Sequence, residues 1–254
     1  YELDAREEWE DERCWPKANP GLGTIKNIRQ LRDKVRKAQQ SPDLQRNLLC
    51  KEFNIRETSG GSWLSFDDIN NETLFDVAEL RPRYGVGGAD LSSTDDLTAA
   101  CVIFMLPEYS DIYVIPMFWI PADLVERHIN EDKVRYDIWI DKGWVRTCPG
   151  NRINPDAVRE WFLEVQSEYD IYLNLVGYDS WSAELWVNEM KRSFGDSTMR
   201  PVIQGKKTLS NPMKMLAKDL QAHKIIYNNN GVLKWCMANT CVDEDRNGNI
   251  QPIK

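Results

Sequence analysis

Residues 83–120 read RYGVGGADLSSTDDLTAACVIFMLPEYSDIYVIPMFWI. Three stretches within them are apolar or glycine-rich, at 83–90, 98–106 and 112–120, and each has the length of a single strand. Polar residues fill the connections, LSSTDD after the first stretch and LPEYSD before the third. Because such short connections join antiparallel neighbours, the sequence predicts a three-stranded meander whose first strand ends at Asp90.

Helices and strands alternate after the meander. Asn154-Pro155 has the cap and first residue of a helix, whose apolar stripe is Val158, Trp161, Phe162 and Val165. The following stretches predict a strand at 171–179, a helix to about Phe194, a strand at 199–205 and a helix starting at Asn211-Pro212. This alternation favours parallel pairing under covering helices. The expected fold class is therefore α/β, with a mixed sheet of an antiparallel meander followed by parallel strands, flanked by helices.

Residues 1–62 have a different character, charged and helical. Thr24 is a candidate cap for a helix through IKNIRQLRDKVRKAQQ, and Ser41-Pro42 has the signature of a second helix start. The segment WPKANPGLG at 15–23 has two Pro and two Gly and is typical of irregular chain. We therefore predict two parts, a helical segment at 1–62 and an α/β domain at 63–254.

Composition narrows the classes of function. The chain has 254 residues, 42% of them hydrophobic, and no apolar run near the roughly 18 residues that a membrane span needs. Its six cysteines are scattered, which favours reduced thiols over a zinc site. With only two histidines, metal chemistry would depend on carboxylates, which select Mg²⁺ or Mn²⁺. A net charge of −8 argues against a protein that coats DNA generally, so any DNA would meet a local basic surface.

Two aspartates stand at the ends of predicted strands. Asp90 ends the first strand and Asp179 ends the strand IYLNLVGYD. In open α/β sheets, ligands gather at such strand ends, and two divalent ions about 4 Å apart can clamp a phosphodiester undergoing cleavage. Aspartate also commonly ends strands because it suits turns, so the positions alone favour a turn role.

Several stretches of the chain, in order, resemble the large subunit of tailed-phage terminases, and this resemblance covers nearly the whole chain. GGADLSSTDDLTA is similar to the first nuclease motif of that family, and LVGYDSW to its second. WPKANPGLG resembles the segment that joins the ATPase and nuclease parts. The further similar stretches are FWIPADLVER, RTCPGN, LSNPMKMLAKDL, VLKWCMAN and TCVDEDRNGNIQPIK.

This resemblance implies a ribonuclease H-like nuclease with a catalytic, metal-binding set of Asp90, Asp179 and Asp96. Asp96 would bind metal directly or through water; its alternative is a turn role, which is also the interpretation for Asp95. The implied cofactor is a pair of Mg²⁺ or Mn²⁺ ions. The implied activity is endonucleolytic cutting of concatemeric double-stranded DNA during phage genome packaging in the host cytoplasm, with no membrane involved. The portal protein, the terminase small subunit and an upstream ATPase domain, whose end would be residues 1–62, are the implied partners.

The chain departs from the family pattern in two places. The family's third acid follows the NGNIQPIK stretch, and the chain stops at Lys254, so the resemblance implies a site completed downstream. No P-loop is present: GKKT at 205–208 has Arg200 in place of the first Gly and Lys207 in place of the hydroxyl residue, which leaves a surface loop or a DNA-phosphate contact. Two rival functions stay open, a non-catalytic module that docks on the portal or small subunit, and another ribonuclease H-like enzyme such as a resolvase or integrase.

One further motif has a bland explanation. The stretch 243–248, DEDRNG, matches the start of an EF-hand calcium loop, but its twelfth position is Lys254 in place of a bidentate Glu. Asn247-Gly248 is instead a hairpin turn signal. We also expect Trp119, Trp161, Trp186 and Trp235 to pack in the core rather than to stack on bases.

Overall fold

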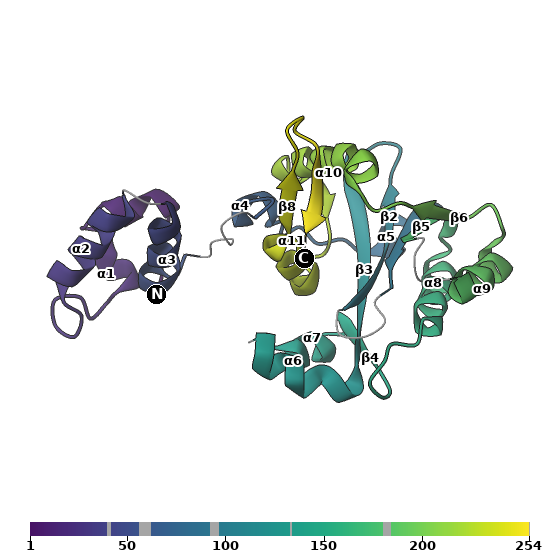
Figure 1. Ribbon diagram of the computed structural model, residues 1–254, viewed down its shortest axis with the longest axis horizontal. Helices are drawn as coiled ribbons and strands as arrows, with labels where there is room; N and C mark the ends of the chain where they lie inside the picture. The colour runs from purple at the N-terminus through teal and green to yellow at the C-terminus, as the bar shows by residue number, and fades with distance from the viewer. Residues whose placement is uncertain (40–41, 56–61, 92–96, 133, 180–183, 254) are drawn as a thin grey trace. The chain divides into compact units, whose positions relative to one another are not determined.

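The computed structural model describes residues 1–39, 42–55, 62–91, 97–132, 134–179 and 184–253 (Figure 1). The chain divides into two compact units, one of Tyr1–Asp67 with Ala238–Cys241 and one of Asp68–Met237 with Val242–Lys254. The change of character expected at residue 62 lies close to this division. That residues 1–62 are the end of an ATPase part stays a prediction.

The first unit is helical. Its elements are a 3₁₀ turn at Arg6–Glu10, α1 (Trp15–Ala18), α2 (Ile28–Ala38) and α3 (Pro42–Phe53). Leu31, Val35 and Ala38 of α2 are buried in one cluster with Leu49 and Phe53 of α3, as the helical spacing of apolar residues requires. The helix starts later than expected, because Asn27, not Thr24, is its cap: the Asn27 side chain accepts the N–H of Arg29 at 2.9 Å.

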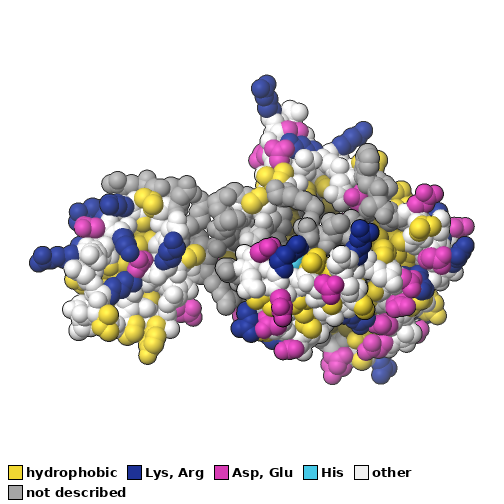
Figure 2. All heavy atoms as spheres, turned by 60° about the horizontal axis from the view of Figure 1, so that its bottom comes forward, with side chains coloured by type: hydrophobic (Ala, Val, Ile, Leu, Met, Phe, Trp, Pro, Cys, Tyr) yellow, Lys and Arg dark blue, Asp and Glu magenta, His cyan; other side chains and the backbone are white. Residues whose placement is uncertain are grey.

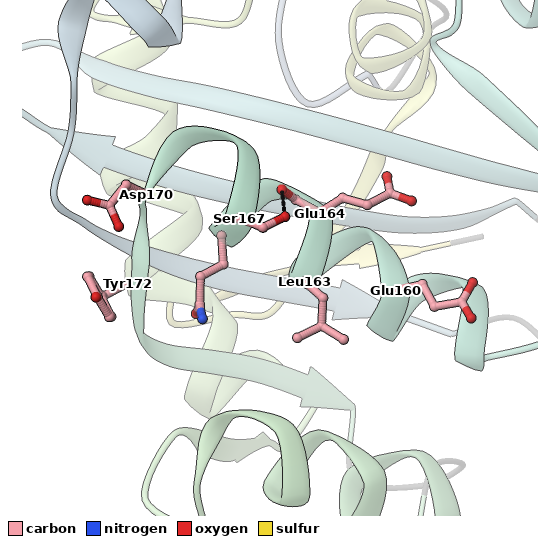
Figure 3. A pocket seen from close by; sticks show the side chains of 7 residues that line it. Glu160, Leu163, Glu164, Ser167, Asp170 and Tyr172 are labelled. Atoms are coloured by element: carbon pink, nitrogen blue, oxygen red, sulfur yellow. Dashed lines mark hydrogen bonds between the residues drawn. The ribbon is translucent and has the colours of Figure 1, made fainter.

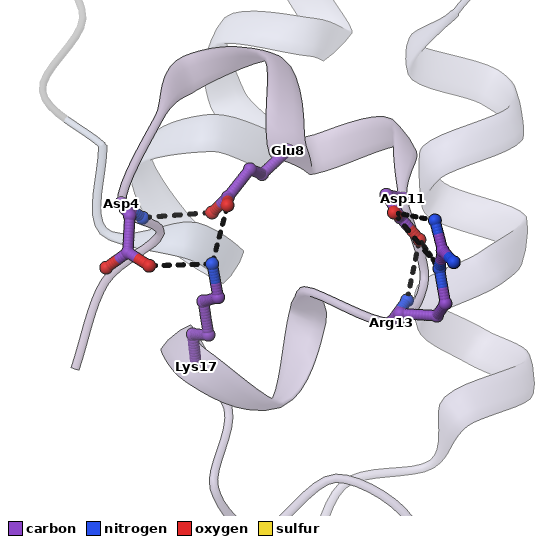
Figure 4. Close-up of polar contacts among 5 residues, drawn as sticks. All are labelled: Asp4, Glu8, Asp11, Arg13 and Lys17. Carbon is purple, nitrogen blue, oxygen red and sulfur yellow. Dashed lines mark hydrogen bonds and ion pairs between the residues drawn. The ribbon is translucent and has the colours of Figure 1, made fainter.

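Polar contacts fix the N-terminal segment of this unit (Figure 4). Lys17 bridges Asp4 and Glu8, at 2.6 and 2.5 Å, and Arg13 forms a two-pronged pair with Asp11. The Arg13 guanidinium lowers the pKa of Asp11 to about 2. The indole N–H of Trp15 donates to the carbonyl of Trp9 at 2.8 Å, so the nitrogen of this buried ring has a hydrogen-bond partner.

The second unit is built around a mixed sheet. Its strands are β1 (Tyr84–Asp90), β2 (Thr98–Met105), β3 (Ile112–Pro121), β4 (Val145–Cys148), β5 (Tyr172–Asp179), β6 (Met199–Val202) and β7 (Ile225–Ile226). The order is β4-β3-β2-β1-β5-β6, with β7 also paired to β3. β1, β2 and β3 are the expected antiparallel meander, while β5 and β6 continue the sheet in parallel from β1. The predicted mixed topology is confirmed.

Helices and a small hairpin complete this unit. They are α4 (Phe66–Ile69), α5 (Val77–Leu80), a 3₁₀ turn at Ala122–Leu124, α6 (Val125–Asp132), α7 (Tyr136–Asp141), α8 (Asp156–Tyr169), α9 (Glu184–Phe194), α10 (Lys206–Gln221) and α11 (Gly231–Asn239), with the hairpin strands β8 (Cys241–Glu244) and β9 (Ile250–Ile253). The hairpin forms at the Asn247-Gly248 turn, as predicted, and Gly248 has a φ of 76°.

The main core lies between the sheet and the helices α8 and α9. Phe162 and Val165 of α8 are buried there with Val102 and Val176 of the sheet. Trp119, Trp161 and Trp186 are all buried in this cluster, which confirms their structural role. Because neighbouring residues of a strand face opposite sides, Phe118 and Ile120 lie on the other face, where Tyr136 of α7 and Val232 of α11 cover them. Trp235 is half-buried on this other face, where its ring packs against Tyr136 and Trp139.

Helix α10 begins earlier in the chain than the sequence predicts. Asn211-Pro212 has the sequence of a helix beginning, yet α10 already begins at Lys206 and Pro212 lies inside it. The amides of Thr208 and Leu209 bond to the carbonyl of Gly205, so the first turn forms upstream of the proline. The proline ring has no N–H to bond to the carbonyl four residues earlier, so the helix continues through it with one hydrogen bond fewer.

Candidate active site

Asp90 and Asp179 end two adjacent parallel strands. The β1–β5 ladder pairs Gly88 with Gly177 and Ala89 with Tyr178, and each aspartate follows directly. Neighbouring strands are about 4.8 Å apart, so both acids lie at one edge of the sheet. Asp90 is exposed and Asp179 is half-buried. The adjacency of their strands was the condition for the two carboxylates to meet, and the structure fulfils it.

The two acids lie on the face of the sheet away from α8. An added Cβ at Gly87 would meet Cε1 of Phe162 at 2.9 Å, so position 87 faces that helix. Positions 88 and 90 therefore face the other way, and the register gives the same direction to positions 177 and 179. Asp90 and Asp179 are thus not buried under α8 and can contact a ligand at the sheet edge.

A glycine stands two residues before each acid, in the stretches GAD at 88–90 and GYD at 177–179. A Cβ at Gly88 would meet only Sγ of Cys101, at 3.6 Å, and one at Gly177 would meet Cγ2 of Val202 at 3.4 Å. At positions 88 and 177, beside the two acids, this face of the sheet therefore carries no side chain. The repeated Gly-x-Asp spacing is the signal of this feature in the sequence, and the predicted site did not include either glycine.

Neighbouring groups at this edge come from β2 and β6. Asp90 pairs with Ala99 and Asp179 with Val202, so the strands on either side contribute small or aliphatic side chains. Cys101 lies across from Gly88, and burial raises the pKa of its thiol to about 11. This thiol is protonated near neutral pH and is a poor nucleophile, so a cysteine-based reaction does not fit the site.

Asp96 and Asp95, the other acids of the first motif, lie outside the described residues. Within the residues that are described, no three His, Cys, Asp or Glu side chains form a group that could hold a metal ion. Asp90 and Asp179 supply carboxylate oxygens, the donors that Mg²⁺ and Mn²⁺ prefer, so the chemistry of the pair fits these ions.

A hollow of about 660 Å³ lies elsewhere, beside α8 (Figure 3). Glu160, Glu164 and Asp170 line it, together with Tyr172 at the start of β5. Asp179 is at the other end of the same strand, which a seven-residue rise places about 23 Å away. Arg146 already neutralises Glu164 at 2.7 Å. This hollow is therefore separate from the edge that carries Asp90 and Asp179.

Asp245, in the stretch that matches part of a calcium loop, has a structural role. Its carboxylate accepts the N–H groups of Asn247 and Asn249 at 2.8 and 2.9 Å, and the Asn249 side chain at 3.0 Å. These bonds, with the Asn249 side chain as the main cause, lower the pKa of Asp245. The carboxylate thus stabilises the hairpin turn, as the turn interpretation predicts.

None of the described helices is long and apolar enough to span a membrane.

Comparison with known proteins identifies the family of this chain. Residues 1–254 match the family model of the terminase large subunit endonuclease domain. The terminase large subunit of Enterobacteria phage HK97 is 24% identical over 251 residues, which cover 98% of the chain and 48% of that protein. That of Lactococcus phage p2 is 23% identical over 257 residues, covering 100% of the chain and 47% of that protein.

The crystal structure of the HK97 large terminase shares the fold. Its TM-score is 0.64 at 23% identity, over 100% of the chain and 51% of that structure. The chain spans about half the length of these relatives. The ribonuclease H-like fold expected from the sequence is confirmed. On the match of its whole length, the chain belongs to the terminase large subunit endonuclease domain family.

Proposed function

We propose that this domain is a metal-dependent endonuclease that cuts concatemeric double-stranded DNA during phage genome packaging. The observation that carries the proposal is the β1–β5 register, which brings Asp90 and Asp179 to one sheet edge in a chain of an endonuclease family. Membership of the family supports endonuclease activity, and the two acids are the residues that we propose carry it out.

The proposed roles of the residues follow from their positions. Asp90 and Asp179 would hold a pair of Mg²⁺ or Mn²⁺ ions, with Asp96 as a further ligand. Bound there, such ions would supply an activated water and charge stabilisation of the leaving oxygen. The glycines at 88 and 177 leave room for a DNA backbone beside the carboxylates. No covalent bond to the protein is needed, which agrees with the protonated thiol of Cys101.

Partners of the whole protein belong to the same proposal. In the full-length subunit, the domain would act with an upstream ATPase domain, the portal protein and the terminase small subunit in the host cytoplasm. These partners would bring the concatemer to the cutting site, and that site would lie at the sheet edge that carries Asp90 and Asp179.

Manganese titration by calorimetry is the first test. The unchanged chain should bind Mn²⁺, and both Asp90→Asn and Asp179→Asn should lose that binding, because each removes an anionic oxygen donor. Asp196→Asn is the matched control: this exposed aspartate lies in the connection between α9 and β6, away from the edge. Absence of binding at millimolar Mn²⁺ would instead favour the rival function, a non-catalytic module that docks on the portal or small subunit.

Plasmid cleavage is the second test. Supercoiled DNA with Mn²⁺ should be nicked by the full-length subunit, taken as the parent, and by its Asp196→Asn variant, whereas its Asp179→Asn variant should lose at least about a hundredfold in rate, since charge stabilisation at such sites has that size. Equal cutting by Asp179→Asn and the parent would overturn the assignment of the site.

A further inference from the structure

A second hollow, of about 530 Å³, lies between the first half of α10 and the β8–β9 hairpin. Its basic residues are Lys206, Lys207 and Lys214, and Asn211, Asp245 and Asn249 also line it. Acidic and basic side chains are intermixed on the face of the second unit that Figure 2 shows. With a net charge of −8, attraction for a polyanion must come from a local patch, and three lysines around one concave surface make such a patch.

The lysines of this basic hollow keep donors for a ligand. Lys207 is exposed and has no ion pair with any described residue. Lys206 contacts Asp243 at 2.7 Å, and Lys214 donates to the carbonyl of Gly248 at 2.5 Å. Each ammonium group has three N–H bonds, so these two contacts orient the side chains and leave further donors.

The one carboxylate that lines the basic hollow is already engaged. Asp245 accepts hydrogen bonds from the backbone of its own turn and from Asn249. Those hydrogen bonds occupy much of the acceptor capacity of the Asp245 carboxylate, and the N–H groups that donate them partly compensate its negative charge. An incoming anion would therefore meet mainly the ammonium groups and the Asn211 amide.

The basic hollow is close to the acid pair along the chain. Val202 of β6 pairs with Asp179, and Lys206 follows four residues later. Extended chain and strand spacing together limit the Asp179–Lys206 Cα distance to about 19 Å. A DNA strand cut beside Asp179 would therefore have phosphates within reach of the lysines a few nucleotides away.

We propose that this basic hollow binds the phosphodiester backbone of DNA next to the cut. Lys207 would be the main contact, supported by Lys206 and Lys214, and all three are positioning residues. Phosphate contacts fix the register of a protein on DNA without reading its sequence, so the hollow would set where along the backbone the acids act. The choice of DNA as the ligand rests on the proposed function. The presence of a basic hollow is a feature of the structure and does not depend on that function.

Binding can be tested without cleavage. Anisotropy of a fluorescent DNA duplex, titrated in EDTA at several salt concentrations, compares the chain with Lys207→Glu. The variant should bind roughly three- to tenfold more weakly, and its slope of log affinity against log salt should be smaller by about 1. Lys218→Glu is the matched control, since Lys218 is an exposed lysine of the same helix outside the hollow.

Two outcomes would overturn the inference. One is unchanged affinity and salt slope for Lys207→Glu; the other is an equal loss for Lys218→Glu, which would show that a negative charge anywhere on this helix weakens DNA binding, whether or not it lies in the hollow. If the basic surface serves an acidic protein instead, the DNA titration of Lys207→Glu will match that of the parent.

Kinetics separate this inference from the proposed function. With Mn²⁺, Lys207→Glu should raise KM for DNA and leave kcat unchanged, because it removes binding away from the reacting bond. Asp179→Asn should lose cutting and keep the duplex affinity measured in EDTA. If Asp179→Asn cuts normally, the proposed active site fails while the test of the hollow still stands. A lower kcat with unchanged KM for Lys207→Glu would overturn the inference that Lys207 binds DNA away from the reacting bond.

Discussion

Glycines one position apart in β1 have opposite environments. Gly87 faces the core, where an added Cβ would lie 2.9 Å from Cε1 of Phe162 and 3.0 Å from Cγ2 of Val176. Gly88 faces away, and its nearest neighbour is Sγ of Cys101 at 3.6 Å. One glycine is therefore needed for packing, and the other leaves space beside the proposed site.

This difference predicts two distinct defects. Gly87→Ala should lower the free energy of unfolding by about 1–3 kcal/mol, because Phe162 is fully buried and has little room to move. Gly88→Ala should leave it within about 0.5 kcal/mol. Gly88→Val should cut plasmid roughly ten- to a hundredfold more slowly by displacing the backbone of the substrate. Urea unfolding and plasmid nicking check both; a Gly88→Val protein that cuts as fast as the parent would contradict the role of the space.

Single residues of the site were partly predictable. Asp90 and Asp179 follow apolar runs, and this pattern marked both as strand ends. Their adjacency was not readable from the sequence, because it depends on which strand β5 joins, and the pairing of strands so distant in the chain leaves no local signal. The assignment of all three aspartates as metal ligands stays a prediction.

Among the elements, helix starts were the least predictable. Thr24 and Asn27 both suit a cap. The structure uses Asn27, which accepts the N–H of Arg29, whereas the Thr24 hydroxyl donates to the carbonyl of Gly21 in the turn before the helix. Asn211-Pro212 suits a helix start equally well, yet α10 begins at Lys206. Strands were easier to place, since the apolar runs at 98–105 and 112–121 are longer than any competing turn signal.

The interior proline of α10 gives a prediction about this helix. Pro212 is exposed, so Pro212→Ala should restore the hydrogen bond to the carbonyl of Thr208 without a new clash. The free energy of unfolding should rise by roughly 1–3 kcal/mol, given the low helix propensity of proline. Urea denaturation measures it, with Ala217→Gly as a control expected to change stability in the opposite direction by about 1 kcal/mol. A less stable Pro212→Ala protein would show that the proline is required where it stands.

Across the whole second unit, segments some 150 residues apart are tied by buried polar contacts. The Asn71 side chain donates to the carbonyls of His223 and Ile225 at 2.9 and 3.0 Å, and the Tyr227 hydroxyl accepts the Asn71 N–H at 3.2 Å. The same hydroxyl donates to the carbonyl of Ile69. These bonds connect the chain before β1 to the chain around β7.

Removing the hydrogen bonds of the Asn71 side chain should destabilise the entire second unit. Asn71→Ala leaves two carbonyl groups without their donor, which should lower the free energy of unfolding by about 2–4 kcal/mol. Asn130→Ala is the matched control, because among the described residues the exposed Asn130 amide bonds to the carbonyl of Glu126 in its own helix; it should change stability by less than about 0.5 kcal/mol. A shift for Asn71→Ala no larger than that of the control would refute the importance of the tie.

The parallel pairing of β1 with β5 also has a consequence for the timing of synthesis. Asp90 and Asp179 are 89 residues apart in the chain, and β5 must emerge from the ribosome before it can join β1. At a synthesis rate of roughly 5–20 residues per second this interval lasts roughly 5–18 s. A nascent chain therefore displays Asp90 before Asp179, and the two can lie side by side only once β5 has been made and has joined β1. Under the proposed function, this order of synthesis delays any attack on surrounding DNA until the sheet has assembled.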